Sequence, residues 1–277
     1  MTIRYHNDSF RALPDDPISP EAALAIRLRT GTNKARRLTD LAITMRSPGQ
    51  DAALALGYLF AEGIIHRRAD VVKVQANPGN SEIVLQLAEH IVLDESQHQR
   101  RGPSTASCGV CGKQHLDQLD PVRCYFPPAN SPQIPPALIC QLPEQLRQQQ
   151  ALFTQTGGMH AAARFRPDGQ LLDVQEDVGR HNALDKLLGQ ALQTDDLPWR
   201  EHLVLVSGRV SFELVQKAAM AGTPVLAAIG APSSLAIAQA EASGMTLIGF
   251  VKKDRLNVYT HPERLRGAVT NSELRSR

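Results

Sequence analysis

The sequence predicts an α/β protein with a smaller α+β unit at its N-terminus, and three observations lead to this class. From residue 160 to residue 251 the chain alternates strand and helix patterns, which favours parallel strands covered by helices. The part up to about residue 87 mixes one apolar helix with several strand patterns. Between these parts lies a polar stretch without apolar spacing, followed by a proline-rich one.

Length and composition indicate a folded protein without a membrane segment. The chain has 277 residues, of which 42% are hydrophobic, enough for one large or two moderate domains. No segment approaches the roughly 20 apolar residues that cross a bilayer, and residues 1–11 lack the apolar core of a signal peptide. We therefore expect a cytoplasmic location and no membrane partner. The net charge of +2 gives no reason to expect nucleic-acid binding.

The N-terminal unit is predicted to hold one helix among strands. In the run from Ser47 to Gln50, a serine precedes proline and glutamine follows three residues later, which is the spacing of a capping box. We expect the helix to run from there to about Glu62. Four strands are predicted around it, over residues 22–29, 38–45, 71–75 and 83–87.

The second half is predicted to form strands and helices in alternation. The strands are expected over residues 160–165, 171–176, 203–207, 225–229 and 246–251, and the helices over residues 180–193, 212–221 and 233–243. These elements give four predicted divisions of the chain. They are an N-terminal α+β domain with a mobile loop at its end (1–107), a Cys-X-X-Cys loop with a proline-rich connector (108–136), an α/β cofactor-binding domain (137–266) and a disordered tail (267–277).

Cys108-Gly109-Val110-Cys111 is the sharpest local motif. The four cysteines of the chain are too few for a disulfide scaffold of this size, so we expect reduced thiols. Three interpretations remain open: half of a zinc site completed by a residue such as His115 or His160, redox or sulfur-transfer chemistry, and no special role. Flanking glycines and the nearby Lys113 suit an exposed thiolate that attacks sulfur.

Three strand-to-helix junctions are candidate anion sites. Residues 207–211, 230–234 and 250–255 each follow a predicted strand, where free helix amides or cations attract phosphate, and ligands of open α/β sheets bind at this edge. Turn-forming glycines and solvated cations are the alternative. None of the junctions has the spacing of a P-loop or of G-x-G-x-x-G.

His181 and Asp185 are spaced i to i+4 at the start of a predicted helix. They are interpreted either as an acid–base or ligand-orienting pair or as a capping and surface pair. A third motif, His160-Ala161-Ala162, has the spacing of the zinc nucleoside deaminases. Alanine stands at position 162, where that class has its catalytic glutamate, and no cysteine follows Cys140, so we do not expect deamination.

Taken together, these segments resemble the formate dehydrogenase accessory sulfurtransferase family, FdhD. The resemblance spans residues 17–265. The matching segments are residues 57–65, 108–112, 160–162, 176–188, 211–220 and 258–262.

The resemblance implies a cytoplasmic sulfurtransferase that takes sulfur from a cysteine desulfurase as a persulfide. The sulfur passes to the molybdenum or tungsten bis(guanine dinucleotide) cofactor of formate dehydrogenase. This cofactor is the molecule on which the protein acts. Cys108 matches the persulfide-bearing cysteine and Cys111 its partner. The family's cofactor-binding segment matches Phe250, Val251, Lys252, Lys253, Asp254 and Arg255. No metal site and no tightly bound cofactor of its own is implied.

The resemblance also implies a homodimer and a main domain with a cytidine deaminase-like, three-layer arrangement of sheet and helices. In this hypothesis Lys252, Lys253 and Arg255 hold phosphate, and His181 or Arg209 orients the guanine or the pterin. Asp254 stands where some relatives have glycine, and its charge opposes a nearby phosphate. The alternatives are a cofactor-binding chaperone with a structural or zinc-binding Cys-X-X-Cys, and a dithiol oxidoreductase.

Overall fold

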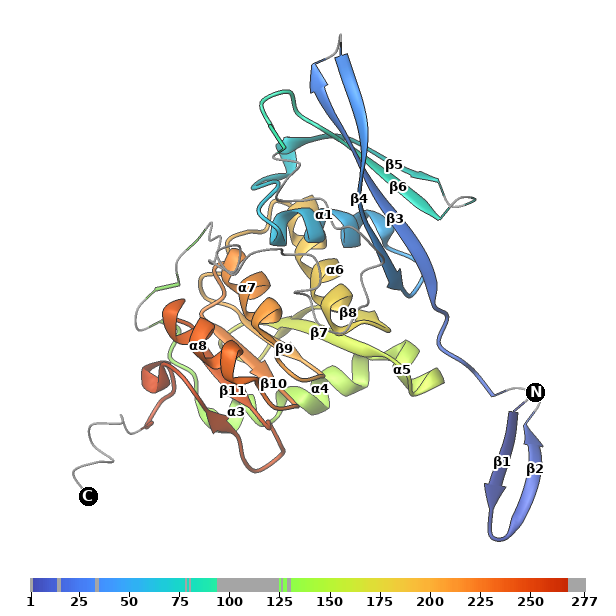
Figure 1. Ribbon diagram of the computed structural model, residues 1–277. Helices are drawn as coiled ribbons and strands as arrows, with labels where there is room; N and C mark the ends of the chain where they lie inside the picture. Colours follow the sequence, from blue (N-terminus) through green and yellow to red (C-terminus); the bar gives the residue numbers. More distant parts are fainter. Residues whose placement is uncertain are drawn as a thin grey trace.

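The structure is a computed structural model that describes most of the chain (Figure 1). The described residues are 2–13, 16–32, 35–77, 79, 81–93, 125, 127–128 and 131–268. Cys108 and Cys111, the predicted mobile loop and all but the start of the predicted tail lie outside these ranges. No helix within them is both long and apolar enough to cross a membrane.

A mixed six-stranded sheet forms the centre of the larger unit, with the strand order β12-β11-β10-β9-β7-β8. β10 pairs in parallel with both β9 and β11, whereas β7, β8 and β12 pair antiparallel with their neighbours. The strands are β7 (His160–Phe165), β8 (Leu171–Asp177), β9 (Leu203–Val206), β10 (Val225–Ala228), β11 (Thr246–Gly249) and β12 (Asn257–Val258).

Helices cover both faces of this sheet (Figure 1). One face packs on α6 (Arg180–Gln193), α7 (Phe212–Met220) and α8 (Ser234–Ala242), and the other on α3 (Pro136–Ile139) and α4 (Leu142–Gln149), which α5 (Ala151–Thr156) follows. The strand side chains alternate between the two cores, so that Val204 and Val206 face one layer and Leu203 and Leu205 the other. The predicted three-layer α/β class is confirmed.

A four-stranded sheet with the order β4-β3-β6-β5 forms the N-terminal unit. Its strands are β3 (Ala22–Thr32), β4 (Ala35–Arg46), β5 (Val71–Asn77) and β6 (Glu82–Leu87), and α1 (Asp51–Ala61) and the short η1 (Arg68–Asp70) lie between β4 and β5. A separate hairpin of β1 (Thr2–His6) and β2 (Ser9–Leu13) stands apart from the body (Figure 1). The short η4 (Pro262–Arg264) follows β12.

Two glycines let α1 and α6 cross in backbone contact. A Cβ atom on Gly57 would lie 1.8 Å from the carbonyl oxygen of Asp185, and one on Gly189 would lie 1.8 Å from that of Ala53. Residues of both sheets belong to one continuous hydrophobic cluster that passes through this crossing. The small unit is therefore held directly against the helix whose N-terminus reaches the candidate site. The predicted division of the chain into domains stays a prediction.

The predicted capping box is wrong. The helix begins at Asp51, and its N-cap residue Gln50 has a left-handed backbone and accepts no side-chain cap bond. The Ser47 hydroxyl instead accepts a bond from the Val178 amide at 3.1 Å, and the Ser47 amide bonds the Asp177 carboxylate. Tertiary partners more than a hundred residues away therefore replace the local cap.

Candidate functional site

The three parallel strands end at one edge of the sheet, and the loops that follow them are tied together there. The Gly230 amide donates to the Gly208 carbonyl at 3.2 Å, and the Phe250 amide donates to the Gly230 carbonyl at 3.0 Å. The predicted junction at residues 230–234 therefore contacts both of the others, at residues 207–211 and 250–255. This carboxyl edge is where open α/β sheets bind ligands.

A groove follows this edge and consists of two pockets of about 510 and 700 Å³, a size typical of ligand sites. Arg147 and Ile229 line both pockets, so the two are neighbours. The smaller one, the polar compartment, is also lined by Gln150, Phe153, Gly157, Gly158, Met159, His160, Val178 and Ser207. The larger one, the cationic compartment, is also lined by Cys140, Gln141, Pro143, Glu144, Gln145, Val251, Lys252 and Lys253.

The cationic compartment takes its charge from the turn after β11. Val251 is buried and its amide donates to the Ala228 carbonyl at 3.0 Å, which anchors the turn to β10. The Lys252 amide donates to the Arg255 carbonyl at 2.8 Å and closes the turn, leaving the side chains of Lys252 and Lys253 exposed. Two flexible ammonium groups at a groove wall suit phosphate oxygens.

Cys140 also lines the cationic compartment, as a free and buried thiol. Burial raises its pKa, and the negative charge of Asp254 raises it further. A thiol with a raised pKa stays protonated near neutral pH and is a poor nucleophile. Cys140 is therefore a wall residue of the groove, unsuited to carry sulfur.

His160 and Ser207 both line the polar compartment. The Ser207 hydroxyl accepts the Ala161 amide at 2.9 Å, and the His160 Nδ1 atom lies 3.4 Å from it. Burial lowers the pKa of His160, the positive charge of Arg180 lowers it further, and Asp177 opposes the shift. The imidazole is thus neutral at physiological pH, with both a donor and an acceptor nitrogen.

Arg147 lines both compartments. Its guanidinium carbon lies 4.4 Å from the centroid of the Phe153 ring, within the range of a cation–π contact, and its Nη1 donates to the Thr154 hydroxyl at 3.0 Å. The side chain is therefore fixed at two points, although it is exposed. Sequence analysis missed Arg147 and Phe153, because the chain between residues 137 and 159 carries no recognisable motif.

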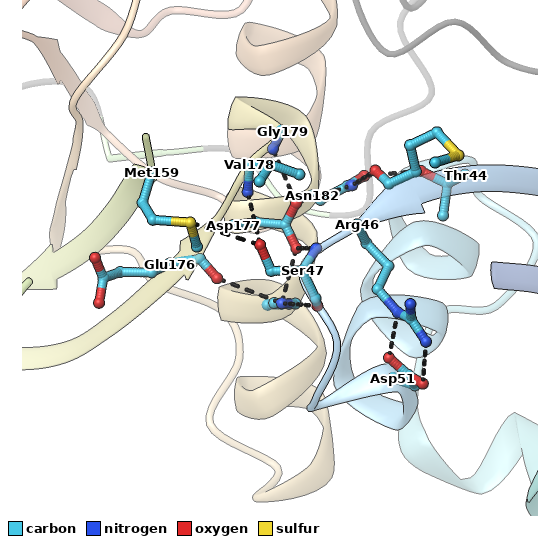
Figure 2. A network of polar contacts seen from close by, with 12 residues as sticks. Thr44, Arg46, Ser47, Asp51, Met159, Glu176, Asp177, Val178, Gly179 and Asn182 are labelled. Carbon is cyan, nitrogen blue, oxygen red and sulfur yellow. Dashed lines mark hydrogen bonds and ion pairs between the residues drawn. The ribbon is translucent and has the colours of Figure 1, made fainter. Parts of the chain in front are cut away.

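A buried polar network lies behind the polar compartment (Figure 2). The Asp177 carboxylate, which has no exposed surface, accepts the amides of Ser47 at 3.1 Å and Gly179 at 2.9 Å. Lys186 pairs with it at 2.8 Å, and the Asn182 amide group donates at 3.2 Å. The network joins the end of β4 to the loop between β8 and α6, and therefore joins the N-terminal unit to the groove wall.

A second buried cluster contains His181 and Asp185, so their interpretation as a surface pair is wrong. The His181 Nε2 atom lies 3.0 Å from the Ser211 hydroxyl and 3.5 Å from Glu213. Asp185 pairs with Lys217 at 2.7 Å. Burial raises the pKa of Asp185 to about 7, although the positive charge of Lys217 lowers it.

The structure separates the predicted cofactor residues into two sets. Val251, Lys252 and Lys253 line the cationic compartment, whereas Phe250, Asp254 and Arg255 are in the same turn but are not among its lining residues. His181 and Arg209 line neither compartment. Within the described ranges, no three or more histidine, cysteine, aspartate or glutamate side chains gather where they could hold a metal ion.

The fold and the groove define an α/β protein with a candidate site for an elongated, partly anionic ligand at the carboxyl edge of its sheet. Comparison with known proteins is consistent with this class. The FdhD/NarQ family profile matches residues 21–266. The chain belongs to the FdhD/NarQ family.

Similar proteins span nearly its whole length. "Sulfur carrier protein FdhD" of Streptomyces coelicolor is 43% identical and covers 96% of this chain and 95% of its own. The protein of that name from Mycolicibacterium paratuberculosis is 48% identical over 80% of this chain and 85% of its own.

A solved structure has the same fold. The crystal structure of a putative formate dehydrogenase accessory protein from Desulfotalea psychrophila aligns with a TM-score of 0.73 and 25% identity, covering 95% of this chain and 97% of its own. Guanine deaminase of Nitrosomonas europaea aligns over 48% of this chain with a TM-score of 0.33, a value too low to carry an argument.

Proposed function

We propose that this protein is a cytoplasmic sulfurtransferase of formate dehydrogenase maturation. Cys108 takes sulfur from a cysteine desulfurase and delivers it to the molybdenum or tungsten bis(guanine dinucleotide) cofactor, with Cys111 assisting the relay and a homodimer as the working unit. The observation that carries this proposal is the likeness to proteins named sulfur carrier FdhD over almost their full length. The groove with its cationic turn supports the cofactor as the ligand.

The first step is a thiol exchange without net oxidation. The Cys108 thiolate attacks the outer sulfur of the desulfurase persulfide, the sulfur–sulfur bond of the donor breaks, and the donor cysteine leaves as a thiolate. Cys108 then carries a persulfide. The cofactor, as the substrate of the second step, has pyrophosphate groups for Lys252 and Lys253 to bind.

The test is to trap the persulfide. After incubation with cysteine desulfurase and cysteine, the peptide that contains Cys108 should gain the mass of one sulfur, and Cys108→Ala should abolish formate dehydrogenase activity without unfolding the protein. Cys140→Ala is the matched control for sulfur uptake, because that buried thiol should take no sulfur and its loss should leave persulfide formation on Cys108 intact. Full activity of Cys108→Ala would refute the carrier role.

Metal analysis of the purified protein distinguishes sulfur transfer from the alternative function, a cofactor-binding chaperone with a zinc-binding Cys-X-X-Cys. Stoichiometric zinc in the purified protein, lost on Cys111→Ala, would favour a structural thiol pair. A sulfur mass on Cys108 without bound zinc would favour transfer. A dithiol oxidoreductase would instead show reversible oxidation between Cys108 and Cys111.

A further inference from the structure

A separate pocket lies at the opposite edge of the six-stranded sheet from the groove. Its volume is about 280 Å³, and it is lined at the end of β7, at the start of β8 and by the segment between α6 and β9. Arg164 of β7 pairs with Val204 near the amino end of β9, whereas the groove follows the carboxyl ends of the parallel strands. This amino-edge pocket shares no lining residue with either compartment of the groove.

Arg164 lines the amino-edge pocket and is almost fully buried, with 5% of its surface exposed. Its Nε and Nη2 atoms donate to the Asp173 carboxylate at 2.9 and 2.5 Å, and Nη2 also donates to Asp196 at 2.5 Å. The guanidinium carbon lies 5.0 Å from the centroid of the Trp199 ring. The third nitrogen, Nη1, is buried and bonds no described residue. A buried charged donor without an acceptor is costly, so Nη1 calls for an acceptor from outside the chain.

His202 brings a second buried nitrogen to the same pocket. Its Nδ1 atom also bonds none of the described residues. Burial lowers the pKa of His202, the charge of Arg164 lowers it further, and Asp196 opposes the shift. Arg166 and Glu201 act on the same ring with opposite signs. The imidazole is therefore neutral at physiological pH, and its Nδ1 can either donate to a ligand or accept from it.

The charges that line the amino-edge pocket are balanced. The guanidinium groups of Arg164 and Arg166 line it together with the carboxylates of Asp196 and Glu201. A simple anion would meet both carboxylates there, and a simple cation would meet both guanidinium groups. A zwitterion avoids both conflicts, because its two ends can each lie against the opposite charge. The volume is below the roughly 300–1,000 Å³ of sites for drug-sized ligands, so the ligand must be small.

We propose that the amino-edge pocket binds a free α-amino acid with a short side chain. Its carboxylate accepts hydrogen bonds from the Nη1 atom of Arg164 and from Arg166, and its ammonium group lies against Asp196 and Glu201. The His202 ring completes the polar wall beside the ligand. The inference goes beyond the proposed sulfur transfer and does not rest on it, because the pocket lies at the other edge of the sheet.

The test is a titration of the purified full chain with L-alanine, followed by the NMR signals of the histidine rings. The signal of His202 is assigned by its loss in His202→Gln. L-Alanine should shift it with a Kd of about 0.1–10 mM, as expected for a ligand of so few atoms. L-Lactate replaces the ammonium group by a hydroxyl, and L-alaninamide replaces the carboxylate by an amide. Each analogue should bind at least about tenfold more weakly, because each loses one charge-assisted contact.

Variants at exposed positions locate the site without disturbing the buried ion pairs of Arg164. Arg166→Gln and Glu201→Gln each remove one lining charge and should weaken L-alanine binding about five- to tenfold. Arg200→Gln is the matched control, because Arg200 is an exposed neighbour that is not among the lining residues. It should leave the affinity within about twofold of the wild type. Circular dichroism of each variant checks that the fold is unchanged.

Three results would overturn the proposal. No shift of the His202 signal up to about 50 mM L-alanine would leave water as the only partner of the two buried nitrogens. Equal affinity for L-alanine and either analogue would mean that one end of the zwitterion is not recognised. A loss of affinity in Arg200→Gln as large as that in Arg166→Gln would show a general effect of surface charge in place of a contact inside the pocket.

Discussion

Gly57→Ala tests whether the backbone contact between α1 and α6 holds the two parts of the protein together. The alanine Cβ atom would lie 1.8 Å from the Asp185 carbonyl oxygen, whereas real Cβ contacts stay at 3.0 Å or more. The helices would therefore have to separate by at least about 1.2 Å to reach that limit. Such a shift disturbs the continuous core that runs through the crossing.

The expected cost is the difference between two opposing effects. Over-packing costs about 1–3 kcal/mol, with the upper end expected because the clash is with backbone atoms that cannot rotate away. Alanine gains about 1 kcal/mol over glycine in a helix interior. The net destabilisation should be about 2 kcal/mol, which corresponds to a fall in Tm of roughly 4–8 °C for a chain of this size.

Thermal unfolding followed by circular dichroism measures this change. Gly189→Ala should behave in the same way, because its Cβ atom would meet the Ala53 carbonyl at the same distance. Gly79→Ala is the control, since among the described residues no atom lies within 4 Å of the Cβ atom that it would add. A Tm for Gly57→Ala at or above that of the wild type would mean that helix propensity outweighs the contact, and the argument for a rigid crossing would fail.

Two further predictions concern charge. Burial raises the pKa of Asp185 to about 7. Between the ordinary value of 3.8 and about 7, the folded protein therefore holds a proton that the unfolded chain does not. This contribution to the free energy of unfolding is lost as the pH rises through that window. Asp185→Asn should make the free energy of unfolding depend less on pH, as measured by denaturant titrations from pH 5 to pH 8. The same pH dependence in the variant and the wild type would contradict this prediction. Asp254→Asn removes a negative charge whose field reaches Cys140 in the cationic compartment. It should strengthen pyrophosphate binding roughly two- to fivefold at low salt, and weaker binding in calorimetry would show that Asp254 supports the ligand.

The sequence predicts the secondary structure where the hydrophobic period is regular. Helix α6 matches its predicted bounds, and the parallel strands match within two residues, because their buried runs are bounded by glycine, proline and serine. Periodicity does not specify strand direction, so the antiparallel β7 and β8 within the same sheet were not foreseen. The sequence does not reveal helices α4 and α5, because both are short and α4 is rich in glutamine.

The sequence predicts only part of the candidate site. The junctions after β9, β10 and β11 can be located because parallel strands end at a common edge. Arg147 approaches that edge from the far side of the sheet, and a contact made across layers leaves no local signal. His181 and Asp185 have a recognisable i to i+4 spacing, but the spacing does not show that Ser211 and Lys217 bury them.

Ser47 and Asp177 show why the N-terminal unit matters for the groove. A buried carboxylate is unfavourable unless its oxygens are paired and hydrogen-bonded, and Asp177 meets this condition with donors from β4's end, the loop before α6 and α6 itself. These bonds are directional, so they hold the loop in one position, which apolar packing alone would not require. Val178 of that loop lines the polar compartment, and its amide bonds the Ser47 hydroxyl (Figure 2). The groove wall is thus held in part by a residue of the other unit. Loss of the N-terminal unit should therefore disturb ligand binding, even though none of its described residues lines either compartment.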